Sequence, residues 1–216
     1  MQGFSGNGLG CVRGERRVFA GLGFAVAPGR ALLLTGANGS GKSSLLRIMA
    51  GLLRADAGTL AWDGADTAED DEAHRRRLAY VGHADPVKPA LSVRENLEFW
   101  ARLFGFDGAA ETALDRFGIA RLADLPARYL SAGQRRRLTL ARLALAQASA
   151  AGPRLWLLDE PATGLDEAAN ALLADCVQAH LAGGGIAVIA THGGALDAAL
   201  DARADRLDLA PFTGRA

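Results

Sequence analysis

Short apolar stretches along the chain mark most of the predicted strands. Leu22, Phe24 and Val26 alternate with other residues ahead of a Pro28-Gly29 turn, which predicts a strand with one buried face. Other stretches are apolar at every position, as is typical of parallel strands that are covered on both faces. These stretches span residues 31–34, 78–81, 155–158 and 186–190, and a further short strand is expected over 59–62.

A helical period replaces this pattern over much of the chain between residues 86 and 147. Ser92 and Glu95 have the spacing of a capping box, and apolar residues at helical spacing follow them. Gly118 suits the end of a second helix. Further helices are predicted over residues 45–53, 109–117, 134–147 and 167–181.

The length of 216 residues fits one α/β domain, with a core over 1–85 and 148–216 and a helical insertion over 86–147. Hydrophobic residues make up 50% of the chain, but no run of about 18 apolar residues occurs. The sequence therefore predicts no membrane span. Residues 1–10 also lack the charged start and apolar core of a signal peptide.

Charge and cysteine content narrow the class of partner. The 24 basic side chains balance the 24 acidic ones, whereas nucleic-acid-binding proteins usually carry a basic excess, so no nucleic-acid partner is expected. The arginine runs at 75–77 and 135–137 are interpreted as solvated helix faces. Cys11 and Cys176 lie far apart without a partner pattern, which predicts reduced thiols and neither a disulfide nor a metal site.

The segment Gly36–Ser43 has the G-x-x-x-x-G-K-S spacing of a phosphate-binding loop. Its glycines let backbone N–H groups approach phosphate oxygens, and the N-terminus of the next helix adds donors and a favourable dipole. Lys42 can reach the β- and γ-phosphates, and Ser43 can bind Mg²⁺. Of the 24 lysine and arginine residues only Lys42 and Lys88 are lysines, so a compact ammonium stands where the loop needs one.

Two carboxylates follow a buried strand. Ligands of open α/β sheets bind at the carboxyl ends of the strands, so Asp159 is expected to hold Mg²⁺ and Glu160 to orient the attacking water as a candidate general base. The segment Leu130–Gln134 precedes a helix and, taken alone, is an ordinary N-cap. Its position between the phosphate loop and the two carboxylates makes Ser131 and Gly133 candidates for anion contacts.

Five ordered motifs together resemble the nucleotide-binding domain of ATP-binding-cassette (ABC) ATPases. They are Gly36–Ser43, Leu130–Gln134, Leu157–Pro161, Ala162–Asp166 and Thr191-His192. The resemblance covers essentially the whole chain. It implies a P-loop NTPase (RecA-like) core with a small N-terminal antiparallel β subdomain and an inserted α-helical subdomain. It also implies hydrolysis of ATP with Mg²⁺ as cofactor.

By this resemblance, two ATP molecules lie between the protomers of a head-to-tail homodimer. The implied catalytic residues are Lys42, Glu160 and His192, with His192 at the γ-phosphate. The residues implied to bind ATP within one chain are Gly36, Ala37, Asn38, Gly39, Ser40, Gly41, Lys42, Ser43 and Ser44. Those implied to act across the interface are Ser131, Ala132, Gly133, Gln134 and Asp166. The implied metal ligands are Ser43 and Asp159.

Two positions depart from the family pattern. The family normally has Gln after the strand at 78–81, and this chain has His83, which can ligate a metal or bond to a water but titrates near neutral pH. His83 is therefore a further candidate metal ligand. The family also places an aromatic residue against adenine near the N-terminus. The candidates here are Arg13, whose guanidinium can stack on a base, and Phe19.

The stretch from Val81 to Leu97 and the short chain resemble those ATP-binding subunits of the family that serve cytochrome c maturation. This implies a bacterial protein peripheral to the cytoplasmic face of the inner membrane, partnered by integral membrane permease subunits that handle haem. Haem export and release of a haem-loaded periplasmic chaperone both remain open. The four histidines show no axial-ligand motif and no C-x-x-C-H occurs, so the expected ligand of this chain is ATP and not haem.

Three other functions remain as alternatives. An exporter ATPase with a lipid, drug or peptide cargo would more typically have Gln in place of His83. Soluble ABC-type ATPases that act on DNA or ribosomes usually carry long insertions, two cassettes or a basic arm, which this chain lacks. Glu160 argues against a nucleotide sensor without turnover. The apolar stretch Leu97–Phe106, beside the segment His83–Lys88, is a candidate docking surface of which only a minority is expected to be exposed.

Overall fold

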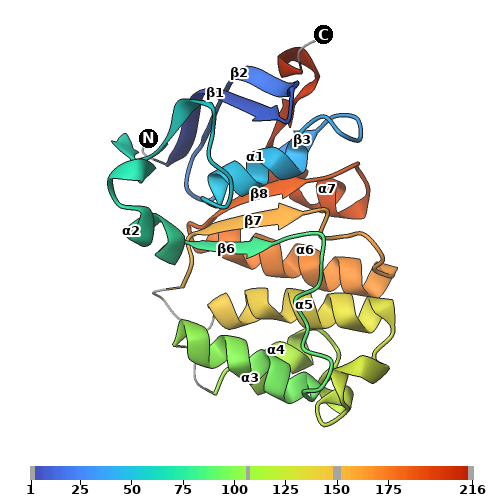
Figure 1. The fold of residues 1–216 in the computed structure, drawn as a ribbon. Coiled ribbons are helices and arrows are strands. Elements are labelled where there is room, and N and C mark those ends of the chain that lie inside the picture. Colours follow the sequence, from blue (N-terminus) through green and yellow to red (C-terminus); the bar gives the residue numbers. More distant parts are fainter. Residues whose placement is uncertain (1–2, 106–107, 148–151, 214–216) are drawn as a thin grey trace.

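A computed structural model describes residues 3–105, 108–147 and 152–213, and its strands form two sheets (Figure 1). The larger sheet is parallel throughout, in the order β6-β7-β8-β3-β9. Its strands are β3 (Ala31–Thr35), β6 (Leu78–Val81), β7 (Leu155–Asp159), β8 (Ile186–Ala190) and β9 (Ala204–Asp208). The smaller sheet is antiparallel, in the order β2-β1-β4-β5. Its strands are β1 (Phe4–Arg13), β2 (Arg16–Val26), β4 (Ala57–Trp62) and β5 (Ala65–Asp66).

Helices cover both faces of the parallel sheet. Helix α1 lies between the two sheets, α6 covers the opposite face, α5 packs on α6, and α3 and α4 pack on α5 (Figure 1). The longer helices are α1 (Lys42–Met49), α3 (Val93–Phe104), α5 (Ala132–Gln147) and α6 (Glu167–Ala182). The shorter ones are α2 (Asp71–Arg76), α4 (Ala110–Arg116) and α7 (Ala195–Leu200). The predicted α/β class is confirmed, whereas the division into core and helical insertion stays a prediction.

The central strands are buried on both faces, and their side chains divide between two cores. Leu33 and Trp156 belong to the core under α5 and α6, whereas Leu32, Leu34 and Leu157 belong to the core around α1 and the antiparallel sheet. This follows from the period of two in a strand, which sends neighbouring side chains to opposite faces. The unbroken apolar runs in the sequence therefore have a direct structural cause.

Four strands differ from the sequence-based expectation: β1 and β5, which were not individually predicted, and β6 and β9. The stretch at 78–81 was predicted to be fully buried, but in β6 only Val81 is buried, because β6 is an edge strand with β7 as its one neighbour. Strand β9, with the sequence ADRLD, was not predicted, since four of its five side chains are charged or small. Its pairing with β3 supplies the order that its own pattern does not indicate.

The capping box predicted at the start of α3 is confirmed, and a second one begins α5. In α3, the Glu95 N–H donates to Ser92 Oγ (3.1 Å) and the Ser92 N–H to Glu95 Oε2 (2.7 Å). The same reciprocal pair forms in α5, where the Gln134 N–H donates to Ser131 Oγ (3.2 Å) and the Ser131 N–H to Gln134 Oε1 (2.9 Å). Helix α5 therefore begins at Ala132, two residues before the predicted start.

Both thiols are free and lie in the core, as predicted for reduced cysteines. Burial raises the pKa of the Cys176 thiol to about 12. Burial also raises the pKa of Cys11, with a smaller contribution from the nearby carboxylate of Asp56. Both groups are therefore neutral at physiological pH and behave as small apolar side chains.

A histidine packs against the strand that carries the two carboxylates. The ring of His180, in α6, lies flat on that of Trp156, in β7, with centroids 4.0 Å apart and planes inclined by 8°. Its Nε2–H donates to the carbonyl of Ile186 (3.1 Å), and burial lowers the pKa of His180 to about 4. The neutral imidazole therefore works as a core aromatic group that joins α6 to β7.

We expect the free energy of unfolding to decrease as the pH is lowered, because of His180. Its ordinary pKa of 6.5 exceeds the folded value of about 4, so between these values the unfolded chain binds more protons than the folded one. The loss between about pH 7.5 and about pH 5 should be about 2 kcal/mol. Urea unfolding of wild type and His180→Phe at both pH values measures it. Equal pH-dependent losses in the two proteins would contradict the assignment.

Candidate nucleotide site

The phosphate-binding loop connects β3 to α1 at the carboxyl edge of the parallel sheet. Gly41, directly before α1, has a φ of +102°, and a Cβ there would lie 2.6 Å from Val18 Cγ1 and 2.9 Å from Phe19 Cδ1. Only glycine fits this position without displacing β2 or straining the backbone. The packing of β2 under the loop therefore fixes where α1 begins, and with it where the N–H groups of its first turn point.

Lys42 folds back over the loop. Its Nζ donates to the carbonyl of Gly36 (2.8 Å) and to that of Ala37 (3.3 Å), and the residue is 5% exposed. The ammonium therefore lies among the loop atoms that the sequence assigns to phosphate.

Ser43 and Asp159 meet at the end of β7, as the sequence predicted. Ser43 Oγ donates to Asp159 Oδ1 (3.0 Å), and Asp159 is 2% exposed. The second carboxylate oxygen, Oδ2, and Ser40 Oγ are buried without a hydrogen-bond partner in the described part of the chain. Buried polar atoms without partners are costly, and a hydroxyl beside a carboxylate is a donor set suited to a hard cation. The residues present therefore fit Mg²⁺ together with a phosphate group.

Glu160 and His192 form a second pair beside the first. Glu160 Oε1 lies 3.0 Å from His192 Nε2, and β8, which ends just before Thr191, is the neighbour of β7. Glu160 has a φ of +48°, a conformation that costs free energy for a non-glycine residue and is concentrated at functional sites. The turn after β7 thus presents the Glu160 side chain toward His192, the second residue after β8.

His83 lies in the exposed segment after β6. Within the described ranges, no group of three or more His, Cys, Asp or Glu side chains could hold a metal ion, so His83 does not join Asp159 and Glu160 in such a cluster. A cation at Ser43 and Asp159 would accordingly have few protein ligands, the usual situation for Mg²⁺ at a nucleotide. The role of His83 as a ligand stays a prediction.

The segment Ser131–Gln134 stands at the N-terminus of α5. Among the residues that the structure describes, no hydrogen bond or ion pair joins it to Gly36–Ser43 of the same chain. Asp166 caps α6 by accepting from the Ala169 N–H (2.8 Å), and Arg137 Nη2 lies 2.6 Å from its Oδ1. The bond from the Ala169 N–H lowers the pKa of Asp166 most, and the contact with Arg137 lowers it further.

The two candidates for adenine stacking differ in exposure. Phe19, the less favoured candidate, is fully buried against Gly41, so its ring has no exposed face to offer to a base. Arg13 is exposed at the end of β1, beside the turn that leads into β2. Its stacking on a base stays a prediction.

The arginine run at 135–137 was interpreted as a solvated helix face, and this is wrong for its central residue. Arg136 is 6% exposed, whereas Arg135 is exposed and Arg137 is half-buried. Neighbouring residues of a helix point about 100° apart, so three consecutive side chains cannot share one face. Because α5 packs against α6 as well as against α3 and α4, one of the three side chains points inward. The run at 75–77 is exposed as predicted.

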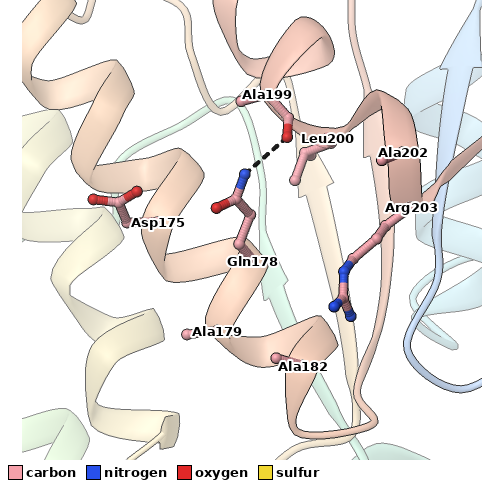
Figure 2. Close-up of a pocket in the computed structure, with 8 residues that line it drawn as sticks. All are labelled: Asp175, Gln178, Ala179, Ala182, Ala199, Leu200, Ala202 and Arg203. Carbon is pink, nitrogen blue, oxygen red and sulfur yellow. Dashed lines mark hydrogen bonds between the residues drawn. The ribbon is translucent and has the colours of Figure 1, made fainter.

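A hollow of about 470 Å³ lies between the second half of α6 and the segment from α7 to Arg203 (Figure 2). Its lining includes Asp175, Gln178 and Arg203, and Gln178 Nε2 donates to the carbonyl of Ala199 (2.8 Å). The end of α6 leads into the start of β8, so this hollow lies at the amino edge of the sheet, opposite the phosphate-binding loop. It is therefore separate from the nucleotide site.

Comparison with known proteins agrees with this geometry. The family model described as ABC transporter matches residues 19–163. A protein of Paramagnetospirillum magneticum named "Cytochrome c biogenesis ATP-binding export protein CcmA" is 55% identical over 194 residues, which is 88% of this chain and 87% of that protein. A protein of Rhodospirillum rubrum with the same name is 55% identical over 193 residues, covering 88% of this chain and 79% of that one.

Solved structures show the same fold. One described as the ATP-binding subunit of an ABC transporter has a TM-score of 0.80 at 23% identity, over 99% of this chain and 87% of that chain. Another, the ADP conformation of an ATP-binding cassette, has a TM-score of 0.75 at 22% identity, over 93% of this chain and 85% of that chain. The predicted P-loop NTPase core with its antiparallel β subdomain is thereby confirmed. The phosphate-binding loop, the strand-end carboxylates and these relatives together show that the chain belongs to the ABC transporter family, as one of its ATP-hydrolysing domains.

Proposed function

We propose that this chain is the ATP-hydrolysing subunit of a membrane complex that handles haem during cytochrome c maturation. The observation that carries the proposal is the convergence of two hydrogen-bonded pairs, Ser43–Asp159 and Glu160–His192, at the edge of the sheet that carries the phosphate-binding loop. Residues more than a hundred positions apart thus assemble one phosphate site. The names of the relatives, which refer to cytochrome c biogenesis and export, support the assignment of the cargo system.

The protein groups divide the chemistry of hydrolysis among them. The loop N–H groups and the Lys42 ammonium bind the β- and γ-phosphate oxygens through charge-assisted hydrogen bonds. Ser43 and Asp159 would hold Mg²⁺, which when bound neutralises charge on the phosphates. Glu160 orients the attacking water and accepts its proton, and His192, 3.0 Å from Glu160, orients that carboxylate and contacts the γ-phosphate.

We propose further that two chains enclose ATP in a head-to-tail homodimer. Ser131 and Ala132 are exposed at the N-terminus of α5, where the helix dipole favours an anion. Within the described residues no hydrogen bond or ion pair joins them to the loop of their own chain, which leaves them available to a partner. Asp166 is exposed as well, and in the proposed dimer it couples the two ATP sites across the interface. Hydrolysis removes the γ-phosphate that both chains bind, so the closed dimer loosens.

Coupling to membrane subunits is proposed to pass through α3 and the segment His83–Lys88. Asn96, in α3, accepts from the Lys88 N–H (2.7 Å) and donates to the Lys88 carbonyl (3.0 Å), and the Lys88 ammonium lies 4.1 Å from the ring centroid of Phe99. Phe99 and Leu103 are exposed, whereas Leu97 is buried, in line with the predicted minority. Phe106 and the Phe104 side chain lie outside the described residues.

None of the described helices has the length and apolar character that crossing a bilayer requires. Because the relatives are named for export and cytochrome c biogenesis, we propose a peripheral position on the cytoplasmic face of the bacterial inner membrane, with integral permease subunits as partners and no nucleic acid. Haem export and release of a haem-loaded chaperone would use the same ATPase. An ATPase for a lipid, drug or peptide exporter is the alternative.

Affinity purification from the native membrane tests the cargo system. Tagged Glu160→Gln protein, solubilised gently with ATP and Mg²⁺, is expected to recover membrane subunits of cytochrome c maturation, identified by mass spectrometry and a haem absorbance spectrum. Wild-type protein without nucleotide serves as the control. Recovery of an unrelated permease would keep the ATPase assignment and overturn the haem assignment. Recovery only with DNA or ribosomes would overturn the transporter assignment.

A further inference from the structure

Arg136 connects three segments that the nucleotide site depends on. Its Nε donates to the carbonyl of Pro161 (3.3 Å), and its Nη2 to those of Asp159 (3.4 Å) and Glu160 (2.9 Å). Its Nη1 donates to the carbonyl of Gly82 (3.1 Å) and to Asp85 Oδ1 (3.1 Å). The side chain itself belongs to α5, two residues beyond the segment Ser131–Gln134.

The buried position of Arg136 makes these contacts strong and specific. Taking a guanidinium out of water is costly unless its donors are satisfied, and all three nitrogens of Arg136 have acceptors here. Asp85, whose side chain is 21% exposed, supplies the compensating charge. The planar guanidinium fork can donate at once to carbonyls that follow β6 and β7, which a lysine ammonium cannot do.

The three carbonyls on the β7 side belong to the turn that holds Glu160 at its φ of +48°. A strained backbone persists only where its surroundings over-determine it. Arg136 holds the backbone of this turn, while His192 holds the Glu160 side chain. The direction in which the Glu160 carboxylate points therefore depends on where α5 places Arg136.

We infer that Arg136 is a positioning residue, which sets the Glu160 turn and ties it to α5 and to the segment Gly82–Asp85. The inference rests on the proposed role of Glu160 in hydrolysis. A helix moves as a rigid element, so a shift at Ser131–Gln134 displaces Arg136 and the Glu160 turn together. Occupancy of the segment at the start of α5 and the geometry of the catalytic carboxylate are thereby linked within one chain.

The variants Arg136→Lys and Arg136→Met test this positioning role in the full-length protein. Arg136→Lys keeps the charge and loses the fork, so kcat should fall by about 10²-fold, the cost of a small misplacement of a catalytic group. The Kd for a fluorescent ATP analogue should change by less than about twofold, because the phosphate contacts are unchanged. Arg136→Met should lower kcat at least as much. Arg76→Met, at an exposed arginine of α2, is the matched control and should keep wild-type values.

Introducing Arg136→Lys into the Glu160→Gln variant separates a positioning role of Arg136 from a merely structural one. In single-turnover assays, Arg136→Lys should lower the rate of ATP hydrolysis of the wild-type protein. It should not lower the rate of the Glu160→Gln variant any further, because Arg136 acts through Glu160. An equal fold-loss in both backgrounds, or wild-type kcat in Arg136→Lys, overturns the inference while the role of Glu160 stands. Full turnover by Glu160→Gln alone overturns both.

Asp85→Asn provides a test that does not alter the arginine. It removes the charge of Asp85 while keeping its shape, and should lower kcat with an unchanged Kd for the ATP analogue. If circular dichroism shows that both Arg136 variants fail to fold, Asp85→Asn tests the positioning role of Arg136 in their place. Wild-type kcat in folded Asp85→Asn would then overturn the inference.

Discussion

Glu160→Gln is expected to lower kcat for ATP hydrolysis by about 10³-fold, the range lost with a general base. The amide keeps the size of the carboxylate and can still hydrogen-bond to His192, but it cannot accept a proton from water. Nucleotide affinity should remain within about twofold, because the groups assigned to phosphate binding are unchanged. Single-turnover hydrolysis and titration with a fluorescent ATP analogue measure the two quantities.

The same variant should accumulate the closed dimer. With ATP and Mg²⁺ it should elute as a dimer in size-exclusion chromatography, and without nucleotide as a monomer, because the γ-phosphate that joins the two chains is not removed. Glu69→Gln, at an exposed glutamate in the short turn before α2, is the matched control and should behave as wild type. Hydrolysis at the wild-type rate by Glu160→Gln would remove Glu160 from the mechanism.

The predictability of this fold from its sequence depended on where each strand lies. Strands β3, β7 and β8 could be predicted because burial on both faces requires apolar residues at every position. Strand β1 is Gly-rich and β9 is polar, and both take their order from the neighbours that pair with them. Local pattern cannot reveal such pairing, since it depends on segments far apart in the chain.

The candidate site shows the same division between local and distant causes. Lys42, Asp159 and Glu160 stand in short motifs whose chemistry can be identified from spacing alone. The burial of Arg136 depends instead on the turn after β7 lying beside α5, which the run of three arginines does not indicate. The burial of Phe19 has a related cause, because only the packing of β2 against Gly41 shows that its ring is covered.

Lys42→Ala is expected to weaken ATP binding by about 10²-fold. A charge-assisted hydrogen bond contributes about 1.5–3 kcal/mol, and two of them correspond to at least that factor. The variant also leaves the carbonyls of Gly36 and Ala37 without their donor, so the melting temperature should fall by a few degrees. Titration with a fluorescent ATP analogue and thermal melting followed by circular dichroism measure the two effects.

Two further variants show whether the compact ammonium matters, in a chain that otherwise uses arginine almost throughout. Lys42→Arg should also weaken ATP binding, by about tenfold or more, because the site is 5% exposed and a planar guanidinium cannot occupy the same space between loop carbonyls and phosphates. Lys88→Ala, at the other lysine, should leave ATP affinity unchanged, since Lys88 contacts Phe99 and not the loop. Wild-type affinity in Lys42→Arg would show that positive charge alone suffices, whereas wild-type affinity in Lys42→Ala would remove Lys42 from phosphate binding.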